Sequence, residues 1–352
     1  MKRCLISRYM KLVALLLSMA SFGACEKMFM PDDTPSSATA TFDYLWHQVD
    51  ERYALFDVKN VDWQAMYDSL APQVYDGMAD DSLFAVLRKL LNSLNDGHVD
   101  LWGNNDVASS EDVVLQRYGN GNFNLNVVAL TYLRPDHHTT GGMSYNTIAD
   151  GEVLYVRYGS FSNSATTSQL EAVLKRYPDI KGMVFDIRQN GGGVIQNEWN
   201  LMTLLPDEGQ LLYSTQLKAG PAHDDFSMPQ AVYAPSNGSH TPFSKPFVLL
   251  TDRGCYSAAS SFALCIKRYS NVTVMGDTTA GGLSIPAGGA LPNGWYYRFG
   301  VSRTIAADGI NYENGVPPDQ VVLLDPAATA VGRDNIIDSA CNLILSMTTK
   351  KK

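Results

Sequence analysis

The sequence predicts an α/β fold in which helices cover a parallel sheet, preceded by a small helical region. Residues 246–282 carry the main evidence. There an apolar run at 247–250 meets a turn, followed by helical spacing and a second apolar run at 272–275. Two further apolar runs flank a helical stretch at 166–177. Strands that alternate with helices in this way are typical of a parallel sheet.

Length and composition agree with a large folded core. The chain has 352 residues, of which 45% are hydrophobic and 18% are charged. Its sequence pI of about 5.1 argues against a nucleic-acid partner, because such proteins present basic surfaces. Three cysteines follow residue 25, namely Cys255, Cys265 and Cys341, and an odd number predicts no complete disulfide framework.

The first 24 residues have the pattern of a targeting segment. Basic residues precede a short apolar core at 12–20, and small residues precede Cys25. This resembles a bacterial lipoprotein signal, which implies lipidation at Cys25 and a membrane anchor in the cell envelope, expected at the outer membrane. The alternatives are an ordinary cleaved signal or a membrane anchor, although the apolar core is short for a bilayer span.

The remaining chain divides into three predicted parts. Residues 25–39 are polar and rich in Pro and Ser, as in a tether. Residues 40–102 form a helical N-terminal domain, and residues 103–352 form the α/β core, with no room for a full PDZ domain. Within that core we expect a strand at 124–133 and a long irregular connection at 206–245, as a lid or rim over a cleft.

Ser257 lies where the strand at 247–250 turns into a helix. A serine there can expose its hydroxyl beside the unpaired N–H groups of the first helical turn, which suits a nucleophile with part of an oxyanion hole. A helix N-cap is the commoner role for such a serine. His98 follows a tight Asn-Asp-Gly turn that could aim it into a cleft, although a lone histidine is more often structural.

Two further stretches bear on ligands. Gly191, Gly192 and Gly193 follow a predicted strand and could expose backbone N–H groups, or could form a flexible loop. No nucleotide-binding pattern follows them. His137 and His138 have no cysteine or spaced carboxylates nearby, so the sequence predicts no metal site and no cofactor.

Four stretches in chain order resemble the tail-specific (C-terminal processing) and tricorn-core serine peptidases. They are the Asp-Ile-Arg-Gln-Asn-Gly-Gly-Gly run at 186–193, the Ser-Ala-Ala turn at 257–259, the Gly-Asp-Thr-Thr-Ala-Gly run at 276–281 and the Gly-Val-Pro-Pro-Asp run at 315–319. The resemblance covers roughly residues 40–345. It implies a crotonase/ClpP-like α/β core with Ser257 as nucleophile and with Ala258 and Gly192 or Gly193 as oxyanion donors.

The sequence departs from the tail-specific branch at two positions. Gly282 stands where those proteases carry a catalytic lysine, and Ser260 stands where the family favours an acidic residue. The tricorn-like branch uses a histidine in an Asp-Gly-His context instead, which matches His98. Its glutamate matches Glu313, which could equally be an ordinary turn residue.

The resemblance therefore implies a cell-envelope serine endopeptidase with a Ser257–His98–Glu313 triad. Its substrates would be peptides or unfolded protein tails, and it would use no metal. Two alternatives remain open at this stage. One is a catalytically inactive ligand- or peptide-binding protein of the same fold, and the other is an ester hydrolase, since a triad is not specific for one substrate.

Overall fold

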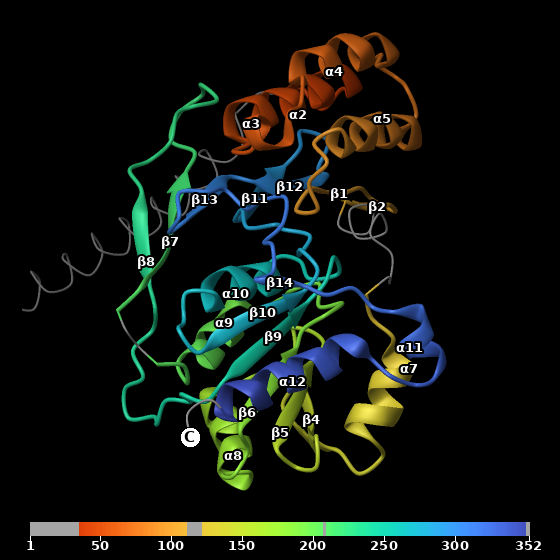
Figure 1. The fold of residues 1–352 in the computed structure, drawn as a ribbon. Coiled ribbons are helices and arrows are strands. Elements are labelled where there is room, and N and C mark those ends of the chain that lie inside the picture. The colour runs from red at the N-terminus through yellow and green to blue at the C-terminus, as the bar shows by residue number, and fades with distance from the viewer. Residues whose placement is uncertain (1–34, 111–121, 207–208, 350–352) are drawn as a thin grey trace, which may run out of the picture.

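A computed structural model of the chain describes residues 35–110, 122–206 and 209–349 (Figure 1). The predicted signal at 1–24 and Cys25 lie outside these residues. Among the residues described, no helix is both long enough and apolar enough to cross a bilayer. The helical region lies at one end of the molecule and the largest sheet at the other.

The N-terminal region is helical because its apolar residues recur at helical spacing. Its elements are α2 (Ala38–Arg52), α3 (Phe56–Lys59), α4 (Trp63–Leu70), the short 3-10 helix η1 (Ala71–Gln73) and α5 (Asp80–Asn92). Phe42 and Leu45 of α2 are buried in a core that Trp295 and Phe299 complete from the C-terminal part. The helices therefore pack on residues more than 200 positions further along the chain.

Phe299 belongs to a four-stranded antiparallel sheet beneath the helices. Its strands are β1 (Asp100–Trp102), β2 (Val107–Ser109), β11 (Pro286–Ala290) and β12 (Tyr296–Gly300), in the order β11-β12-β1-β2. Asp100 of β1 pairs with Arg298 of β12 in the register, and the Arg298 Nε–H donates to the Asp100 carboxylate at 2.7 Å. One residue separates His98 from β1, and β1 pairs with β12 from the C-terminal half of the chain. His98 therefore lies where distant parts of the sequence meet.

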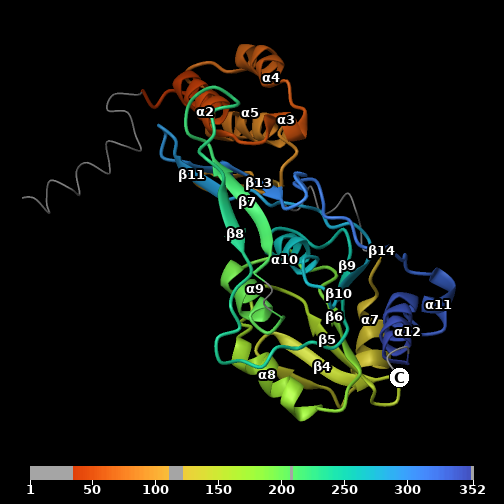
Figure 2. The ribbon, with the colours of Figure 1, turned by 60° about the vertical axis from the view of Figure 1, so that its left-hand side comes forward.

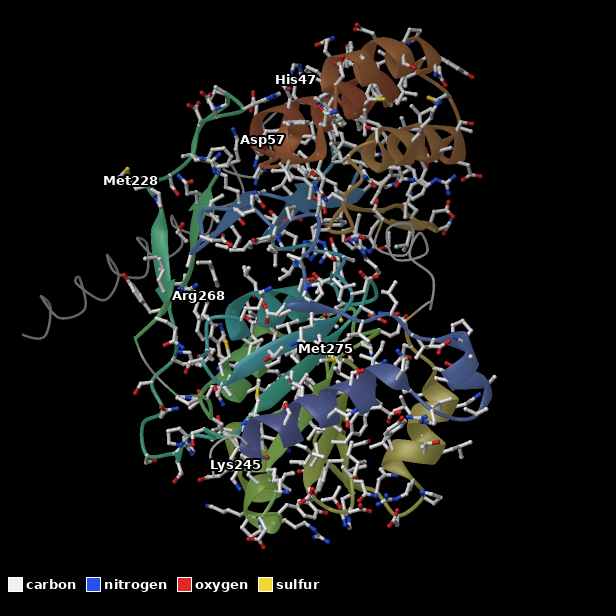
Figure 3. The ribbon with its side chains drawn as sticks, in the orientation of Figure 1. His47, Asp57, Met228, Lys245, Arg268 and Met275 are labelled. Atoms are coloured by element: carbon white, nitrogen blue, oxygen red, sulfur yellow. The ribbon has the colours of Figure 1, made fainter. Side chains whose placement is uncertain are left out.

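Part of the segment at 206–245 forms a hairpin, so the prediction of an irregular connection was wrong there. Strands β7 (Leu211–Leu217) and β8 (Gln230–Tyr233) pair with each other, and β13 (Ser302–Ala306) pairs with β7. The hairpin runs between the helical region and the α/β body (Figure 2). Met228 is 84% exposed at its outer side (Figure 3). The strands were missed because their burial does not alternate cleanly.

A seven-stranded sheet forms the body of the molecule. Its strands are β3 (His138–Thr140), β4 (Met143–Ile148), β5 (Val153–Tyr158), β6 (Gly182–Asp186), β9 (Phe247–Thr251), β10 (Val272–Gly276) and β14 (Gln320–Val321). The order is β14-β10-β9-β6-β5-β4-β3, and the strands from β5 to β14 are parallel. The loops that follow β6 and β9 therefore meet at one edge of the sheet.

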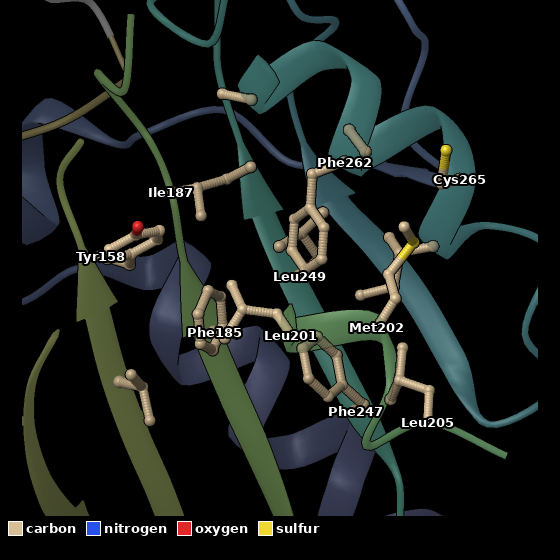
Figure 4. Packing of buried hydrophobic residues seen from close by; sticks show 14 of the residues in the cluster. Tyr158, Phe185, Ile187, Leu201, Met202, Leu205, Phe247, Leu249, Phe262 and Cys265 are labelled. Atoms are coloured by element: carbon tan, nitrogen blue, oxygen red, sulfur yellow. The ribbon is translucent and has the colours of Figure 1, made fainter. Parts of the chain in front are cut away.

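Helices cover both faces of this sheet. On one face lie α8 (Thr167–Arg176), α9 (Ile195–Met202) and α10 (Ala258–Ile266), and on the other lies α12 (Asn335–Thr349), preceded by α11 (Pro326–Ala330). Phe262 of α10 packs with Phe185 and Leu249 (Figure 4), whereas Val184 joins the cluster on the α12 face. Neighbouring strand residues alternate between the two cores, as a sheet buried on both faces requires.

The strand predicted at 124–133 is helical instead, so that prediction was wrong. Helix α7 (Leu125–Val127) continues into the π-helix η2 (Val128–Leu133). The Asn124 side chain accepts a hydrogen bond from the Val127 N–H at 3.1 Å and caps the start of α7. Val128 and Tyr132 are buried against the sheet while Leu130 is exposed, a one-sided pattern that a helix can present. The apolar, β-branched composition had favoured a strand.

Candidate active site

Ser257 lies at the turn between β9 and α10. Its backbone adopts φ 54 and ψ −123, a combination that residues other than glycine rarely adopt. Its N–H donates to the Gly281 carbonyl at 2.9 Å, which ties the turn to the segment after β10. The side chain makes no capping hydrogen bond to the helix. The turn therefore leaves the Ser257 hydroxyl to another partner.

That partner is His98. Its Nε2 lies 3.0 Å from the Ser257 Oγ, although the two residues are 159 positions apart. Burial lowers the pKa of His98, so its imidazole is neutral at neutral pH and can accept a proton. The structure thus brings together two residues that the sequence indicated separately.

Asp96 fixes the backbone that carries His98. The buried Asp96 carboxylate accepts the His98 N–H at 2.9 Å through one oxygen and the Tyr53 hydroxyl at 3.0 Å through the other. Tyr53 directly follows α2, so the histidine turn is connected to the helical region. Sequence reasoning missed Asp96 as a positioning residue. The available signal was its place in the Asp-Gly-His run.

Glu313 is fully buried, and a backbone N–H group orients its carboxyl. Its Oε2 accepts the Leu283 N–H at 2.9 Å. Among the residues described, neither its Oε1 nor the Nδ1 of His98 has a hydrogen-bond partner. Burial, followed by the neighbouring charge of Asp96, raises the pKa of Glu313 to about 8. Glu313 therefore lies near the site without a direct hydrogen bond to His98.

Tyr256 occupies the space that a lysine at position 282 would need. A Cβ atom on Gly282 would lie 2.4 Å from the Tyr256 ring, and Gly282 also has a positive φ of 76°. On the other side of the ring, a Cβ on Gly97 would lie 2.7 Å from it. The ring is thus enclosed between the histidine turn and the Gly282 segment. Since no side chain fits at 282, His98 is the base that this geometry offers to Ser257.

The residues predicted as oxyanion donors border the same cavity. Gly192, Gly193 and Ala258 all line it. A Cβ on Gly192 would lie 2.8 Å from the Cβ of Ser257, so the loop approaches the nucleophile this closely only with glycine there. The Gly192 N–H already donates to the Asn190 side chain at 2.9 Å. This hydrogen bond leaves Gly193 and Ala258 as the better candidates for the predicted donor role.

A buried ion triad holds the glycine loop in place. Arg188 is fully buried, and its guanidinium donates to Asp186 at 2.6 Å and to Asp334, just before α12, at 2.9 Å. The loop is also held by Asp252, which accepts the Gln189 N–H at 2.8 Å. Removal of one member of a buried ion pair typically costs about 3–5 kcal/mol. The buried ion pairs of the predicted Asp-Ile-Arg motif thus fix the position of the glycine loop.

Ser260 forms a polar network without the acidic residue that the family favours at its position. Its buried hydroxyl donates to the Cys255 carbonyl at 3.0 Å and lies 2.8 Å from the Thr279 hydroxyl. It also accepts the Gly281 N–H at 3.2 Å. The serine therefore connects the first turn of α10 to the segment that also holds the Ser257 backbone.

A cavity of about 570 Å³ opens over the Ser257–His98 pair. Its lining combines the catalytic turn and the glycine loop with Tyr213 and Thr215 of β7 and with residues of the Gly282–Pro286 segment. The hairpin at 211–233 therefore contributes one wall, as a rim would. Within the described ranges, no cluster of three or more His, Cys, Asp or Glu side chains is arranged to hold a metal ion. Cys255, Cys265 and Cys341 are buried free thiols.

Comparison with known proteins identifies the family. Residues 152–322 match the model of peptidase family S41, and residues 37–92 match the tricorn protease C1 domain. The chain is 26% identical over 195 residues to the carboxy-terminal processing protease CtpA of Bacillus subtilis, which is 55% of this chain and 38% of that protein. It is 28% identical over 174 residues to the chloroplastic C-terminal processing peptidase of Tetradesmus obliquus, 49% of this chain and 35% of that protein.

The chain thus spans little more than a third of the length of these curated relatives. A crystal structure described as that of a peptidase from Parabacteroides merdae matches far more completely. It has 35% identity and a TM-score of 0.82, and the match covers 88% of this chain and 97% of that one. The predicted α/β fold and family resemblance are confirmed, and the chain belongs to the serine peptidases of family S41.

Proposed function

We propose that this chain hydrolyses peptide bonds in peptides or unfolded protein tails, with Ser257 as nucleophile and His98 as base. The observation that carries this proposal is the 3.0 Å contact between the Ser257 Oγ and the His98 Nε2, in a cavity large enough for a peptide segment. A serine hydroxyl is a weak nucleophile at neutral pH and needs such a neighbouring base.

The chemistry follows from the geometry. The Ser257 Oγ attacks the scissile carbonyl carbon while His98 Nε2 accepts the hydroxyl proton. The negative charge on the carbonyl oxygen is stabilised by the N–H groups of Gly193 and Ala258. His98 then donates its proton to the leaving amine. A water molecule, deprotonated by His98, attacks the acyl-enzyme and regenerates Ser257.

Glu313 completes the proposed triad through charge rather than through a direct hydrogen bond. With a pKa of about 8, its carboxyl holds its proton at neutral pH while His98 is neutral. When His98 becomes an imidazolium, a nearby positive charge lowers the pKa of a carboxyl group. Glu313 would then release its proton to solvent water and, as a carboxylate, stabilise the protonated base.

A fluorophosphonate probe and an unfolded protein substrate test this proposal together. We expect the probe to label Ser257 in the wild type and the protein to cleave casein. Ser257→Ala should lose both activities and keep its thermal unfolding transition. Hydrolysis of p-nitrophenyl butyrate without casein cleavage would instead identify an ester hydrolase. A wild type that neither reacts with the probe nor cleaves casein would be an inactive binding protein.

We also propose that Cys25 is lipidated and anchors the protein in the bacterial cell envelope, at the outer membrane. The support is the basic start, short apolar core and small residues before Cys25. Labelled palmitate should be incorporated into the wild type, and Cys25→Ser should abolish this incorporation and release the protein from membranes. Wild-type protein that takes up no labelled fatty acid would refute the anchor.

A further inference from the structure

A buried carboxyl group lies behind the cavity wall, one helical turn beyond the nucleophile. Ser261 follows Ser257 by four residues on α10 and lines the same cavity. Residues four apart lie on one face of a helix, about 6 Å apart along its axis. The Ser261 hydroxyl donates to the Oε1 of Glu198 at 3.1 Å. Glu198 comes from α9, which packs beside α10.

The hydrogen-bonding capacity of Glu198 is only partly used. Its side chain is fully buried, and its Oε2 has no hydrogen-bond partner among the residues that the structure describes. Buried polar atoms are nearly always paired, so an unpaired one requires an explanation. Burial raises the pKa of Glu198 to about 8, and its titratable neighbours are Cys265 of α10 and Tyr213 of β7. None of these groups is a cation that could compensate a carboxylate.

We propose that Glu198, acting through Ser261, makes this end of the cavity a binding site for a cationic substrate side chain. The side chain would be that of an arginine or lysine preceding the scissile bond. This inference rests on the proposed peptidase function and adds the substrate class. Glu198 is a specificity-determining residue here, since Ser261 lies between it and the cavity.

The shape and polarity of this recess suit such a side chain. Ile195 and the Tyr213 ring line it and can contact the methylene groups of the stem. A Ser261 hydroxyl that donates to Glu198 presents its oxygen lone pairs to the cavity, where they can accept an N–H. The four-carbon stem of lysine is comparable in length to the rise of about 6 Å that four residues of a helix span.

The charges around the cavity also favour a cation. Arg298 lines the cavity, but the buried Asp100 already accepts its Nε–H at 2.7 Å. The Asp96 carboxylate lies near the reacting serine and histidine, and its negative charge favours a cation in the cavity. A cation bound at Ser261 would lower the pKa of Glu198, whose proton would pass to solvent water. A carboxylate would then face the bound cation across the Ser261 hydroxyl.

Matched peptides test the proposal through hydrolysis. Two otherwise identical peptides carry arginine or the isosteric, uncharged citrulline before the cleaved bond. We expect wild-type kcat/KM to be about 10- to 100-fold higher for arginine, the range of a charge-assisted hydrogen bond. Glu198→Gln and Ser261→Ala should each reduce this ratio to within about threefold of unity, whereas the exposed control Glu152→Gln should keep it. Fluorophosphonate labelling of each variant verifies that its site has folded.

A binding measurement keeps this inference separate from the proposed activity. Full-length Ser257→Ala is titrated calorimetrically with n-butylguanidinium and with n-butylurea. We expect the guanidinium to bind more tightly, and Glu198→Gln in the same background should remove the difference. A wild type that cleaves both peptides equally, a preference that survives Glu198→Gln, or equal binding of the two probes would each overturn the inference. Loss of all hydrolysis and labelling with a selective guanidinium site would refute only the proposed function.

Discussion

Ser257 and His98 come from two regions that are built differently. Ser257 belongs to the three-layer body, where its turn is held by the seven-stranded sheet and by the Gly281 carbonyl. His98 belongs to the smaller unit, which consists of the N-terminal helices and the four-stranded sheet. The helices of this unit pack on strands from distant parts of the chain. The position of the proposed nucleophile is thus set by local structure, whereas that of the proposed base is set by how one region packs on the other.

Tyr256 is one point at which the two regions are in contact. Its ring fits between Gly97 and Gly282, and its centroid lies 5.0 Å from that of the His98 imidazole. Tyr256 adjoins the nucleophile in sequence, so a shift of its ring moves the surroundings of both catalytic residues. Substitutions on either side of this ring should therefore reveal how far catalysis depends on the packing of the two regions.

Loss of the base should have the largest effect. His98→Ala removes the proton acceptor of Ser257, and general-base removal typically costs about 10²–10⁴ in rate. The rate at which a fluorophosphonate phosphonylates Ser257, followed by stopped-flow, measures this loss. Lys267→Ala is the control, because Lys267 pairs with Asp319 away from the cavity. Phosphonylation of His98→Ala at the wild-type rate would remove His98 from the mechanism.

The pH dependence of the wild type tests the same residue. The pKa of His98 is lowered by burial, so the imidazole stays neutral to a lower pH than an ordinary histidine. Acylation should therefore fall with decreasing pH only below the usual histidine pKa near 6.5. A midpoint above that value would indicate that another group is the base.

A methyl group at position 282 should displace the Tyr256 ring. Gly282→Ala places a Cβ 2.4 Å from the ring and also strains a backbone with φ 76°. A displacement of about 1 Å at a catalytic site can cost about 10²-fold in rate. Gly151→Ala is a matched control, because Gly151 has φ 85° but no atom within 4 Å of its Cβ position. Equal kcat/KM losses in the two variants would attribute the effect to strain alone.

Removal of the ionisable group of Glu313 should have a smaller effect on the rate. Glu313→Gln keeps the size of the side chain but cannot ionise when His98 becomes protonated, so we expect kcat to fall about tenfold, less than for removal of the base. The folded protein holds the Glu313 proton up to pH 8, whereas the unfolded chain releases it near pH 4.5. Wild-type stability should therefore decrease as pH rises between these values.

Thermal unfolding between pH 5 and pH 9 measures the effect of Glu313 on stability separately from its effect on kcat. The stability of Glu313→Gln should decrease less with pH than that of the wild type, because one buried acid has been removed. Glu152→Gln, at an exposed ion pair, should follow the wild-type curve. If Glu313→Gln and the wild type lost stability in parallel, Glu313 would not be protonated in the folded state.

The sequence predicted the elements around Ser257 better than the packing that brings His98 to it. The apolar run at 247–250, the turn and the helical spacing are local signals, and β9 and α10 match them closely. The pairing of His98 with Ser257 joins residues 159 positions apart, which no local pattern encodes. Likewise, the helical core includes Trp295 and Phe299, so its extent depends on tertiary packing.

Each error concerns a feature that depends on burial or on contacts between distant residues. In the helix at 125–133, the cap supplied by Asn124 and burial against α12 and the sheet outweighed the β-branched composition. The hairpin of β7 and β8 is half-exposed and lacks regular alternation. Asp96, Tyr256 and Glu198 act through contacts made only after folding, so their residue types alone gave no signal.

The smallest expected effect tests whether the helical region positions the base. Tyr53→Phe removes the hydroxyl that donates to the Asp96 carboxylate at 3.0 Å and leaves that oxygen buried. A hydrogen bond of this kind contributes about 1 kcal/mol, so a histidine turn that depends on it should lose about fivefold in kcat, with KM unchanged. Tyr67→Phe is the control, because its hydroxyl donates to Asp43 within the helical region. Both variants should lose similar stability on heating, but only Tyr53→Phe should lose kcat. Equal kcat values in the two variants would show that Asp96 holds the His98 turn without help from the helices.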